Sequence, residues 1–292
     1  AYVNSAVTLT WAAQDASPVT SQGSLNGFSI SSGEVVSAEG AWSWTVTATD
    51  AAGNTATQTR SFVLDAAPPV ITFSGVTDGE LRAAAVTPAW VVQDTSPTAD
   101  FGTLDGLPFV SGTQVAGEGD HLLVVSATDA AGNTALATLT FSIDTTPPVL
   151  TLAGAADGAF LNSAVTLTFS AADAHPGATT STLDGAPFNS GGVVSAEGVH
   201  VWVVTSTDAV GNTATQSRTF TLDFTAPSVT LGGVASGAYY KVPVIPTYAA
   251  TDTNLDTVVA TLDGAPFTSG TPVASEGSHT LIVRATDRAG NV

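Results

Sequence analysis

The sequence contains no cysteine and no methionine, and only six of its 292 residues are lysine or arginine. Without cysteine, neither disulfides nor thiolate chemistry is available to the chain. The six bases face 25 acidic residues, which gives a formal net charge of −19. This balance disfavours nucleic acid as a partner, because phosphate backbones are bound by clusters of lysine and arginine.

Long apolar runs are also missing from the sequence. No stretch approaches the roughly 20 apolar residues of a membrane span, and no signal segment is visible. We therefore expect no membrane insertion by this segment. Charged residues make up only 11% of the chain, against about 25% in typical soluble domains. The surface must then be built largely of threonine, serine, alanine and glycine.

A pattern of 79 residues repeats along the chain without insertion or deletion. The segment 48–54, Ala-Thr-Asp-Ala-Ala-Gly-Asn, returns in closely similar form at 127–133, 206–212 and 285–291. Such self-similarity is typical of repeat architectures. We expect four domains, at 1–69, 70–148, 149–227 and 228–292, of which the first lacks its first strand and the fourth lacks its last. We therefore expect the chain to be a segment of a longer polymer of the same repeat. The expected partners of the segment are further copies of that repeat.

A second pattern divides the copies into two kinds. Copies one and three share the run Asn-Ser-Ala-Val-Thr-Leu-Thr, whereas copies two and four share a mid-strand proline, Pro88 and Pro246. The array therefore resembles a 158-residue pair that has been duplicated. Because proline cannot donate a ladder hydrogen bond, Pro88 and Pro246 predict an edge position or a bulge.

The third copy reads as short strands separated by turns. Threonine and valine enrichment, period-two alternation and regularly spaced Gly, Asn and Asp turns indicate an antiparallel β-sandwich. No segment has a helical period of 3.6 residues, so the chain is predicted to be all-β. The expected strands span 149–152, 164–172, 179–183, a short stretch near 193–194, 199–207 and 213–222.

Comparing the copies indicates which side chains are buried. Positions 44, 46 and 48 of the long strand are apolar or small in every copy, so they are expected to face the core. The second strand carries an aromatic residue in every copy, which we expect at the centre of each domain. These residues are Trp11, Trp90, Phe169 and Tyr248, and Phe62, Phe141 and Phe220 are expected to play a similar part in the last strand.

The other face of the long strand is less polar than a solvated face should be. It carries Leu122, Val201 and Ile282 in copies two to four. One interpretation is β-propensity alone, on a half-covered face. The other is lateral self-association into a filament, because contiguous exposed apolar surface tends to mark an interaction site.

Three motifs carry a resemblance to a known family. They are the linker Asp-Thr-Thr-Pro-Pro at 144–148, the Glu-Gly-x-His start of the long strand, and its Ala-Thr-Asp-x-Ala-Gly-Asn end. Together they resemble the bacterial immunoglobulin-like (Ig-like) repeats of secreted adhesins and surface fibres. The resemblance implies a rod-like tandem array of Ig-like β-sandwiches with about seven antiparallel strands each. It also implies an extracellular location at the bacterial cell surface, often with calcium at the domain junctions.

The acidic residues near the domain ends allow two interpretations. In the first, Asp50 and its copies hold the hairpin turn before the last strand. In the second, the topology brings carboxylates of neighbouring domains together as Ca²⁺ ligands, since Ca²⁺ takes six to eight oxygens. The candidate ligands are Glu39, Asp65, Asp94 and Asp129 at the first junction, Glu118, Asp144, Asp173 and Asp208 at the second, and Glu197, Asp223, Asp252 and Asp287 at the third.

Three histidines, His121, His200 and His279, also recur at the period of 79, but copy one has Trp42 in their place. A position that accepts tryptophan for histidine is expected to pack a flat ring at the rim of the core rather than to bind metal. His175 is solitary. Without cysteine, and with histidine in packing positions, nucleophile–base pairs lack a partner. We therefore expect no enzyme activity.

The sequence favours a structural protein, a segment of a bacterial surface fibre, filament or adhesin stalk that extends and stiffens through end-to-end domains. An alternative is a set of accessory spacer modules, of a glycan-binding kind, in a secreted multidomain enzyme. That alternative needs rows of exposed aromatic residues, whereas most tryptophans here map to core positions, with Trp42 the weakest case.

Overall fold

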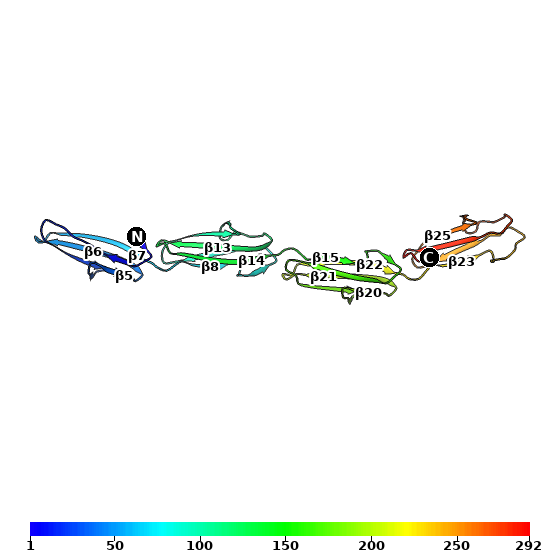
Figure 1. The fold of residues 1–292 in the computed structure, drawn as a ribbon, viewed down its shortest axis with the longest axis horizontal. Coiled ribbons are helices and arrows are strands. Elements are labelled where there is room, and N and C mark those ends of the chain that lie inside the picture. The colour runs from blue at the N-terminus through cyan, green and yellow to red at the C-terminus, as the bar shows by residue number, and fades with distance from the viewer. The chain divides into compact units, whose positions relative to one another are not determined.

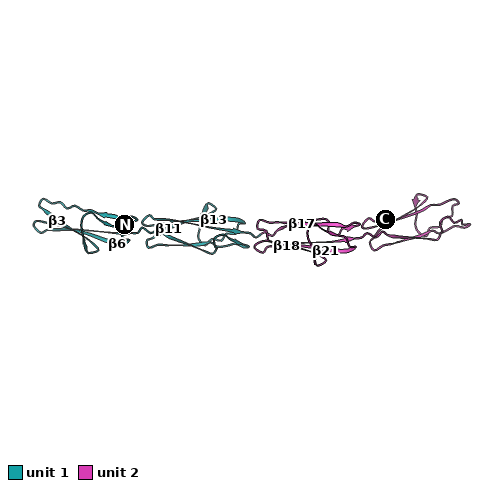
Figure 2. Cartoon of the chain, turned by 60° about the horizontal axis from the view of Figure 1, so that its bottom comes forward, with its two compact units in different colours: residues 1–145 teal, residues 146–292 magenta.

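The computed structural model describes residues 1–292, which form 27 β-strands and no helix (Figure 1). No helix in it is long and apolar enough to cross a membrane. The chain separates into two compact units, residues 1–145 and residues 146–292 (Figure 2). The predicted all-β class is confirmed.

The strands of the first unit follow the period of the sequence. Its first copy contains β1 (Tyr2–Val3), β2 (Val7–Leu9), β3 (Val19–Leu25), β4 (Phe28–Ile30), β5 (Glu34–Val36), β6 (Gly40–Asp50) and β7 (Thr55–Leu64). Its second copy contains β8 (Val70–Ser74), β9 (Glu80–Arg82), β10 (Ala89–Gln93), β11 (Thr98–Leu104), β12 (Leu107–Phe109), β13 (Gly119–Asp129) and β14 (Thr134–Ile143).

The second unit repeats the same order of strands. Its first copy contains β15 (Val149–Ala153), β16 (Phe160–Leu161), β17 (Val165–Ala172), β18 (Ala178–Leu183), β19 (Ala186–Pro187), β20 (Gly192–Val194), β21 (Gly198–Thr207) and β22 (Thr213–Leu222). Its second copy contains β23 (Ser228–Gly232), β24 (Thr247–Thr251), β25 (Leu255–Leu262), β26 (Ala265–Pro266) and β27 (Leu281–Asp287).

Each complete copy is a two-layer sandwich. In the third copy one sheet has the order β16-β22-β21-β18-β19 and the other has the order β15-β17-β20. All pairings are antiparallel except that of β16 with β22. The core is shared by both sheets, since Leu150 and Leu167 of one cluster with Trp202 and Phe220 of the other. The Ig-like sandwich is thereby confirmed.

Two short strands of the third copy are absent from the sequence prediction. β16 and β19 have two residues each, and their places are set by the strands beside them. A two-residue strand has no room for an alternation pattern, so period-two analysis misses it.

The deepest side chains of the third copy lie in the large sheet, and both were predicted to face the core. Trp202 of the long strand is 0% exposed and Phe220 of the last strand is 1% exposed. Of the predicted central aromatics, Trp90 is buried, whereas Trp11, Phe169 and Tyr248 are half-buried. Three of the four aromatic side chains on the second strand therefore lie at the edge of the core rather than at its centre.

Pro88 and Pro246 lie inside the domains at the position that Leu167 occupies in the third copy. β17 changes partner there, since residues 165–167 pair with β20 and residues 168–172 with β15. In the second copy Val86 forms an isolated bridge to Val115, and β10 begins only after Pro88, which is fully buried. The proline thus lies at the point where the strand exchanges one paired neighbour for the other.

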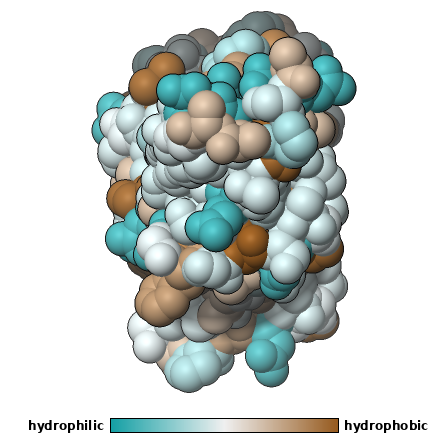
Figure 3. Space-filling view, turned by 90° about the vertical axis from the view of Figure 1, so that its left-hand side faces the viewer, coloured by the Kyte–Doolittle hydropathy of each residue, from teal (hydrophilic) through white to brown (hydrophobic).

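The surface agrees with the low charge content of the sequence. In the face drawn in Figure 3, most residues are pale, and strongly polar or apolar residues are scattered among them. On the outer sheet face of copy one, hydroxyls pair across strands, with Thr45 Oγ1 2.9 Å from Thr59 Oγ1 and Thr47 Oγ1 3.1 Å from Thr57 Oγ1.

The size of the aromatic side chain on the second strand is matched by the size of the residue that packs against it. A Cβ on Gly23 would lie 2.3 Å from the Trp11 ring, and one on Gly102 would lie 2.4 Å from the Trp90 ring. The third copy has Phe169 and Ser181 at the same positions. There the Ser181 hydroxyl accepts a 2.9 Å hydrogen bond from the indole N–H of Trp202. In copy one the corresponding indole N–H, on Trp44, is buried without a partner.

This comparison predicts the outcome of exchanging the pair. Gly23→Ser alone should destabilise the first domain by about 1–3 kcal/mol, because the new side chain overlaps Trp11. The double variant Trp11→Phe/Gly23→Ser should recover most of that loss, since it removes the overlap and gives Trp44 an acceptor. Urea unfolding followed by tryptophan fluorescence measures both. If the free-energy changes of the single variants simply add, the packing account is contradicted.

Candidate repeat-junction site

An aspartate closes the turn that follows the long strand of each copy. Asp50 Oδ1 accepts hydrogen bonds from the N–H groups of Ala52 (2.9 Å) and Asn54 (2.8 Å), and Oδ2 accepts from the side-chain amide of Asn54 (2.8 Å). Asp129 makes the same three contacts with its own turn. The predicted turn-holding role of this aspartate is therefore present in the structure.

These hydrogen bonds favour the charged form of the carboxylates. The side-chain and backbone donors of Asn54 hold the pKa of Asp50 below its ordinary value. Burial acts in the opposite direction on Asp129, but the donors of Asn133 and the turn amides outweigh it, so its pKa is also lowered. The turn aspartates are therefore negatively charged at neutral pH.

At the first junction the turn also contacts the preceding domain. The side-chain amide of Asn133 donates a 2.7 Å hydrogen bond to the backbone carbonyl of Asp65, which lies 68 residues earlier. The Thr95 hydroxyl donates to Asp65 Oδ2 at 3.1 Å. Both bonds join the second copy to Asp65, the residue directly after the last strand of the first copy, so the junction is a hydrogen-bonded contact between the two copies.

Three of the four predicted ligands meet at this junction. Asp65, Asp94 and Asp129 each place one carboxylate oxygen within 4.8 Å of the others, and Asp65 and Asp129 are buried. Asp94 Oδ1 accepts from the N–H and the hydroxyl of Ser96. No lysine or arginine forms an ion pair with this triad.

The third junction repeats the arrangement. Asp223, Asp252 and Asp287 form the corresponding triad. The side chain of Asn291 donates to the carbonyl of Asp223 (2.7 Å), and that of Asn254 donates to Asp223 Oδ2 (2.7 Å).

A further contact at the third junction is a cation–π pair. The Arg288 guanidinium of the last copy lies 3.9 Å from the centroid of the Phe160 ring in the third copy. It adds a contact between the two copies of the second unit, of a kind worth about 0.5–1 kcal/mol at exposed sites.

The glutamates predicted as ligands lie outside these triads and bind the linkers. Glu39 Oε1 accepts from the N–H of Ala66 (3.1 Å), and Glu197 Oε1 accepts from the N–H of Phe224 (2.7 Å). Glu118 accepts from the N–H of Thr145 in the same way (2.8 Å). Each glutamate therefore fixes the first linker residue after the buried aspartate of its own copy.

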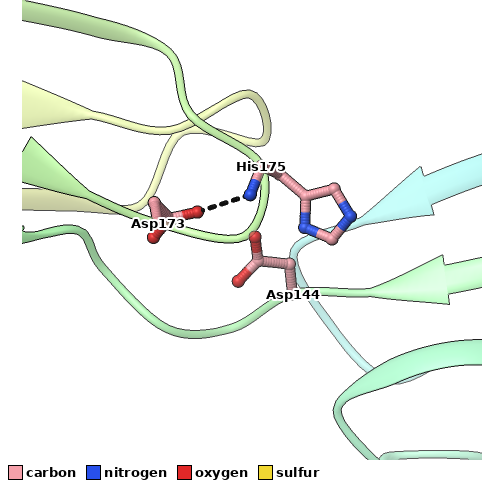
Figure 4. A group of neighbouring side chains, drawn as sticks. All are labelled: Asp144, Asp173 and His175. Carbon is pink, nitrogen blue, oxygen red and sulfur yellow. Dashed lines mark hydrogen bonds between the residues drawn. The ribbon is translucent and has the colours of Figure 1, made fainter.

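The second predicted set is divided between the two units. Glu118 and Asp144 belong to the first unit, in which Asp144 is buried and its N–H donates to the carbonyl of Arg82 (2.9 Å). Asp173 and Asp208 belong to the second. Figure 4 shows Asp173 accepting a 2.8 Å hydrogen bond from the N–H of His175 in the loop after β17. Asp208 closes its turn as Asp50 does.

The three repeated histidines have partners that the sequence analysis missed. His121, His200 and His279 each lie beside the aspartate of an Asp-Gly turn. The expected packing at the core rim is present in two of them: the ring centroids of His121 and Phe141 are 5.1 Å apart, and those of His200 and Phe220 are 5.4 Å apart. The signal was available in the sequence, because copy one changes both members of the pair, to Asn26 and Trp42.

The tryptophans do not form an exposed row. Trp90 and Trp202 are buried, and Trp11, Trp42 and Trp44 are half-buried. The indole N–H of Trp42 donates to the carbonyl of Ala38 at 3.0 Å. The aromatic surface that the glycan-binding alternative needs is therefore not built from these residues.

Comparisons with known proteins agree with this architecture. Residues 111–195 match the model of a family described as bacterial Ig-like domain (group 3). The match begins in the second copy and ends in the third. The resemblance to bacterial Ig-like repeats is confirmed. A search of curated proteins found no match.

Solved structures supply further similarity in fold. An I-band fragment of titin, domains I67–I69, is 11% identical with a TM-score of 0.52, over 76% of this chain and 94% of that one. An E-to-A variant of the same titin domains gives 11% identity and a TM-score of 0.50 over the same shares. A structure from a 1.5-MDa bacterial ice-binding adhesin is 18% identical over 71% of this chain and 86% of that one, with a TM-score of 0.31. The titin fragments share the tandem Ig-like fold.

Proposed function

We propose that this chain is a segment of a long extracellular bacterial fibre or adhesin stalk, in which Ig-like repeats act as stiff spacers at the cell surface. The observation that carries the proposal is the repeated tie between successive domains. In both units the asparagine of the hairpin turn bonds the carbonyl of the aspartate that ends the preceding domain. The family of the matched segment supports a bacterial origin.

The linkers limit bending in three ways. They are short, and proline at positions 68 and 69 fixes φ in the chain between domains one and two. Glu39 holds the N–H of Ala66, and Asn133 holds the carbonyl of Asp65. Because the peptide unit between Asp65 and Ala66 is bonded by a residue of each domain, a bend at this point must break a hydrogen bond. A chain of such units holds whatever it carries at a distance from its base.

The stiffness is tested by a matched pair of asparagine variants. Asn133→Ala and Asn54→Ala each lose a bond to the turn aspartate, but only Asn133 also bonds the preceding domain. A hydrogen bond contributes about 1 kcal/mol, so the amide of Ala66 should exchange about fivefold faster in Asn133→Ala than in Asn54→Ala. Small-angle scattering should show a broader interdomain distribution only in Asn133→Ala. Equal behaviour of the two variants would contradict the proposal.

We further propose that Ca²⁺ binds the carboxylate triads. Asp65, Asp94 and Asp129 fit a hard cation, since they offer oxygen ligands that no base neutralises. Asp223, Asp252 and Asp287 offer the same set. A bound cation would link residues of two domains and stiffen the junction. For the second set, Glu118, Asp144, Asp173 and Asp208, the proposal rests on the sequence.

Calcium binding is tested by calorimetry of the whole chain with Ca²⁺ and with a chelator. Ligand at 100 times its dissociation constant stabilises a folded protein by about 2.7 kcal/mol, so the melting temperature should rise with Ca²⁺. Asp94→Asn should reduce this rise, whereas Asp15→Asn, at the same position in the first copy, should not, because Asp15 belongs to no triad. A melting temperature that is the same with Ca²⁺ and with chelator would refute calcium binding.

Lateral packing into a filament is a separate proposal, carried by the outer sheet face of the second copy. Phe101, Leu122 and Leu136 are exposed there by 56%, 45% and 70%. Phe101 and Leu136 both pair with Ser126, so they lie in one row across three strands. Copy one has Gln22, Ser43 and Thr57 at the same positions, and its face carries hydroxyl pairs.

Replacing the apolar residues with those of copy one tests the lateral contact. Phe101→Gln/Leu122→Ser/Leu136→Thr should leave the fold intact, because all three side chains are solvent-exposed. If the face joins two chains, wild-type protein should show a concentration-dependent rise in sedimentation coefficient, and the triple variant should not. Monomeric wild-type protein at the highest concentration examined would exclude lateral packing through this face.

A further inference from the structure

The histidine of each repeated pair has an acceptor at both ring nitrogens. His121 Nδ1 lies 2.8 Å from Asp105 Oδ2, and Nε2 lies 2.9 Å from the carbonyl oxygen of Gly117. A carbonyl and an ionised carboxylate only accept hydrogen bonds, and a neutral imidazole has only one N–H to donate. Both contacts are therefore satisfied only when the ring carries two protons and a positive charge.

The same geometry recurs in the other two copies. His200 lies 2.8 Å from Asp184 Oδ2 and 2.8 Å from the carbonyl of Ala196. His279 lies 2.7 Å from Asp263 Oδ2 and 3.0 Å from the carbonyl of Ser275, with the Ser275 hydroxyl farther away at 3.4 Å. A coincidence of hydrogen-bond geometry would not be expected to repeat three times at one spacing.

The aspartate of each pair connects the histidine to the sheet. Asp105 occupies the left-handed backbone region, with a φ of 51°, at the start of the turn between β11 and β12. Its Oδ1 accepts from the N–H of Leu122, the residue after the histidine, at 2.8 Å. The pair therefore joins three segments: the Asp-Gly turn, the loop before the long strand, and the long strand itself.

Copy one makes the corresponding hydrogen bonds with tryptophan and asparagine side chains, which do not change charge with pH. The indole N–H of Trp42 donates to the carbonyl of Ala38, four residues before it, as the histidine does. Asn26 Oδ1 accepts from the N–H of Ser43 at 2.8 Å, as the aspartate does. Nothing in this version changes charge between acid and alkaline conditions, so copy one is an internal control.

We propose that His121, His200 and His279 are proton-operated latches, which clamp copies two to four when protonated and release the loop before the long strand when neutral. The first copy, with Trp42 and Asn26, holds the same loop at any pH. The stability of copies two to four therefore depends on pH, whereas that of the first copy does not depend on this contact. Mildly acidic conditions stabilise the three copies, and alkaline conditions destabilise them relative to the first.

The hydrogen bonds and charges around the three rings raise the pKa of each histidine, as the proposal requires. Burial by itself lowers the pKa of His121 and of His200, but hydrogen bonds to the loop carbonyl and the turn aspartate outweigh it and raise the pKa. For His279 the hydrogen bond to Asp263 is the main cause of a raised pKa. The charged groups acting on these rings are all acidic: Asp105 and Asp120 on His121, Asp184 on His200, and Asp263 on His279.

The direction of these shifts fixes the pH range of the effect. A histidine with a raised pKa stabilises the fold fully below its unfolded pKa of about 6.5, and this contribution disappears as the pH rises through the folded pKa. The aspartates have lowered pKa values, so their contribution is lost only in stronger acid, below their unfolded pKa of about 3.9. The latches are therefore strongest between about pH 4 and 6.5.

The composition makes the effect measurable in the whole chain. The sequence has no cysteine, and besides the three latch histidines it contains one other histidine, His175. In a His175→Gln background, the latches are therefore the only histidines left in the chain, and a pH dependence of stability between pH 6 and 9 is assigned to them.

The direct test is nitrogen-15 NMR of the imidazole rings in the intact chain. His121, His200 and His279 should titrate at a higher pH than they do in the same chain unfolded by urea. Below that pH both ring nitrogens should show the shifts of protonated imidazolium. Titration at or below the unfolded value would overturn the proposal, and this measurement needs no variant to fold.

A transplant of the copy-one residues provides the second test. In the His175→Gln background, Asp105→Asn/His121→Trp, with the same exchange at 184/200 and 263/279, should abolish the decrease in melting temperature between pH 6 and pH 9. The exchange made in one copy should remove about a third of that decrease. A decrease that persists unchanged in the fully transplanted chain would overturn the latch.

Discussion

The hairpin aspartate at the end of each long strand is the contact on which the rest of the structure depends. Asp129 receives two backbone N–H groups and the side-chain amide of Asn133, and this arrangement closes the hairpin between the two longest strands of the domain. Because Asn133 is held there, its amide is also aimed at the carbonyl of Asp65 in the preceding domain. One short turn thus completes a sheet and forms a junction.

Much of this could be predicted from a single sequence because the copies serve as an alignment. The position of Val125 and Val204 is apolar in every copy, which identified the buried face of the long strand, and both residues are fully buried. The topological argument about the ends of a sandwich brought Asp65, Asp94 and Asp129 together, as the structure does. These predictions succeeded because periodicity and strand order determine which face and which end a residue occupies.

The failures have a common physical origin, which is the choice between partners at short range. Glu39 is at the predicted end of its domain, but its carboxylate binds a linker amide rather than joining the triad. Pro88 was predicted at an edge or a bulge, and it lies fully buried where the second strand exchanges one partner for another. The pairing of His121 with Asp105 depends on a turn residue at positive φ, which strand periodicity does not encode.

The central claim is that successive domains within a unit are joined rigidly, and electron–electron distance measurement tests it most directly. The chain has no native cysteine, so spin labels can be attached at Thr59→Cys and Thr138→Cys, exposed residues 79 positions apart on equivalent strands. The account predicts a single narrow distance distribution in solution. A broad distribution, of the width expected for domains on a freely jointed linker, would contradict it.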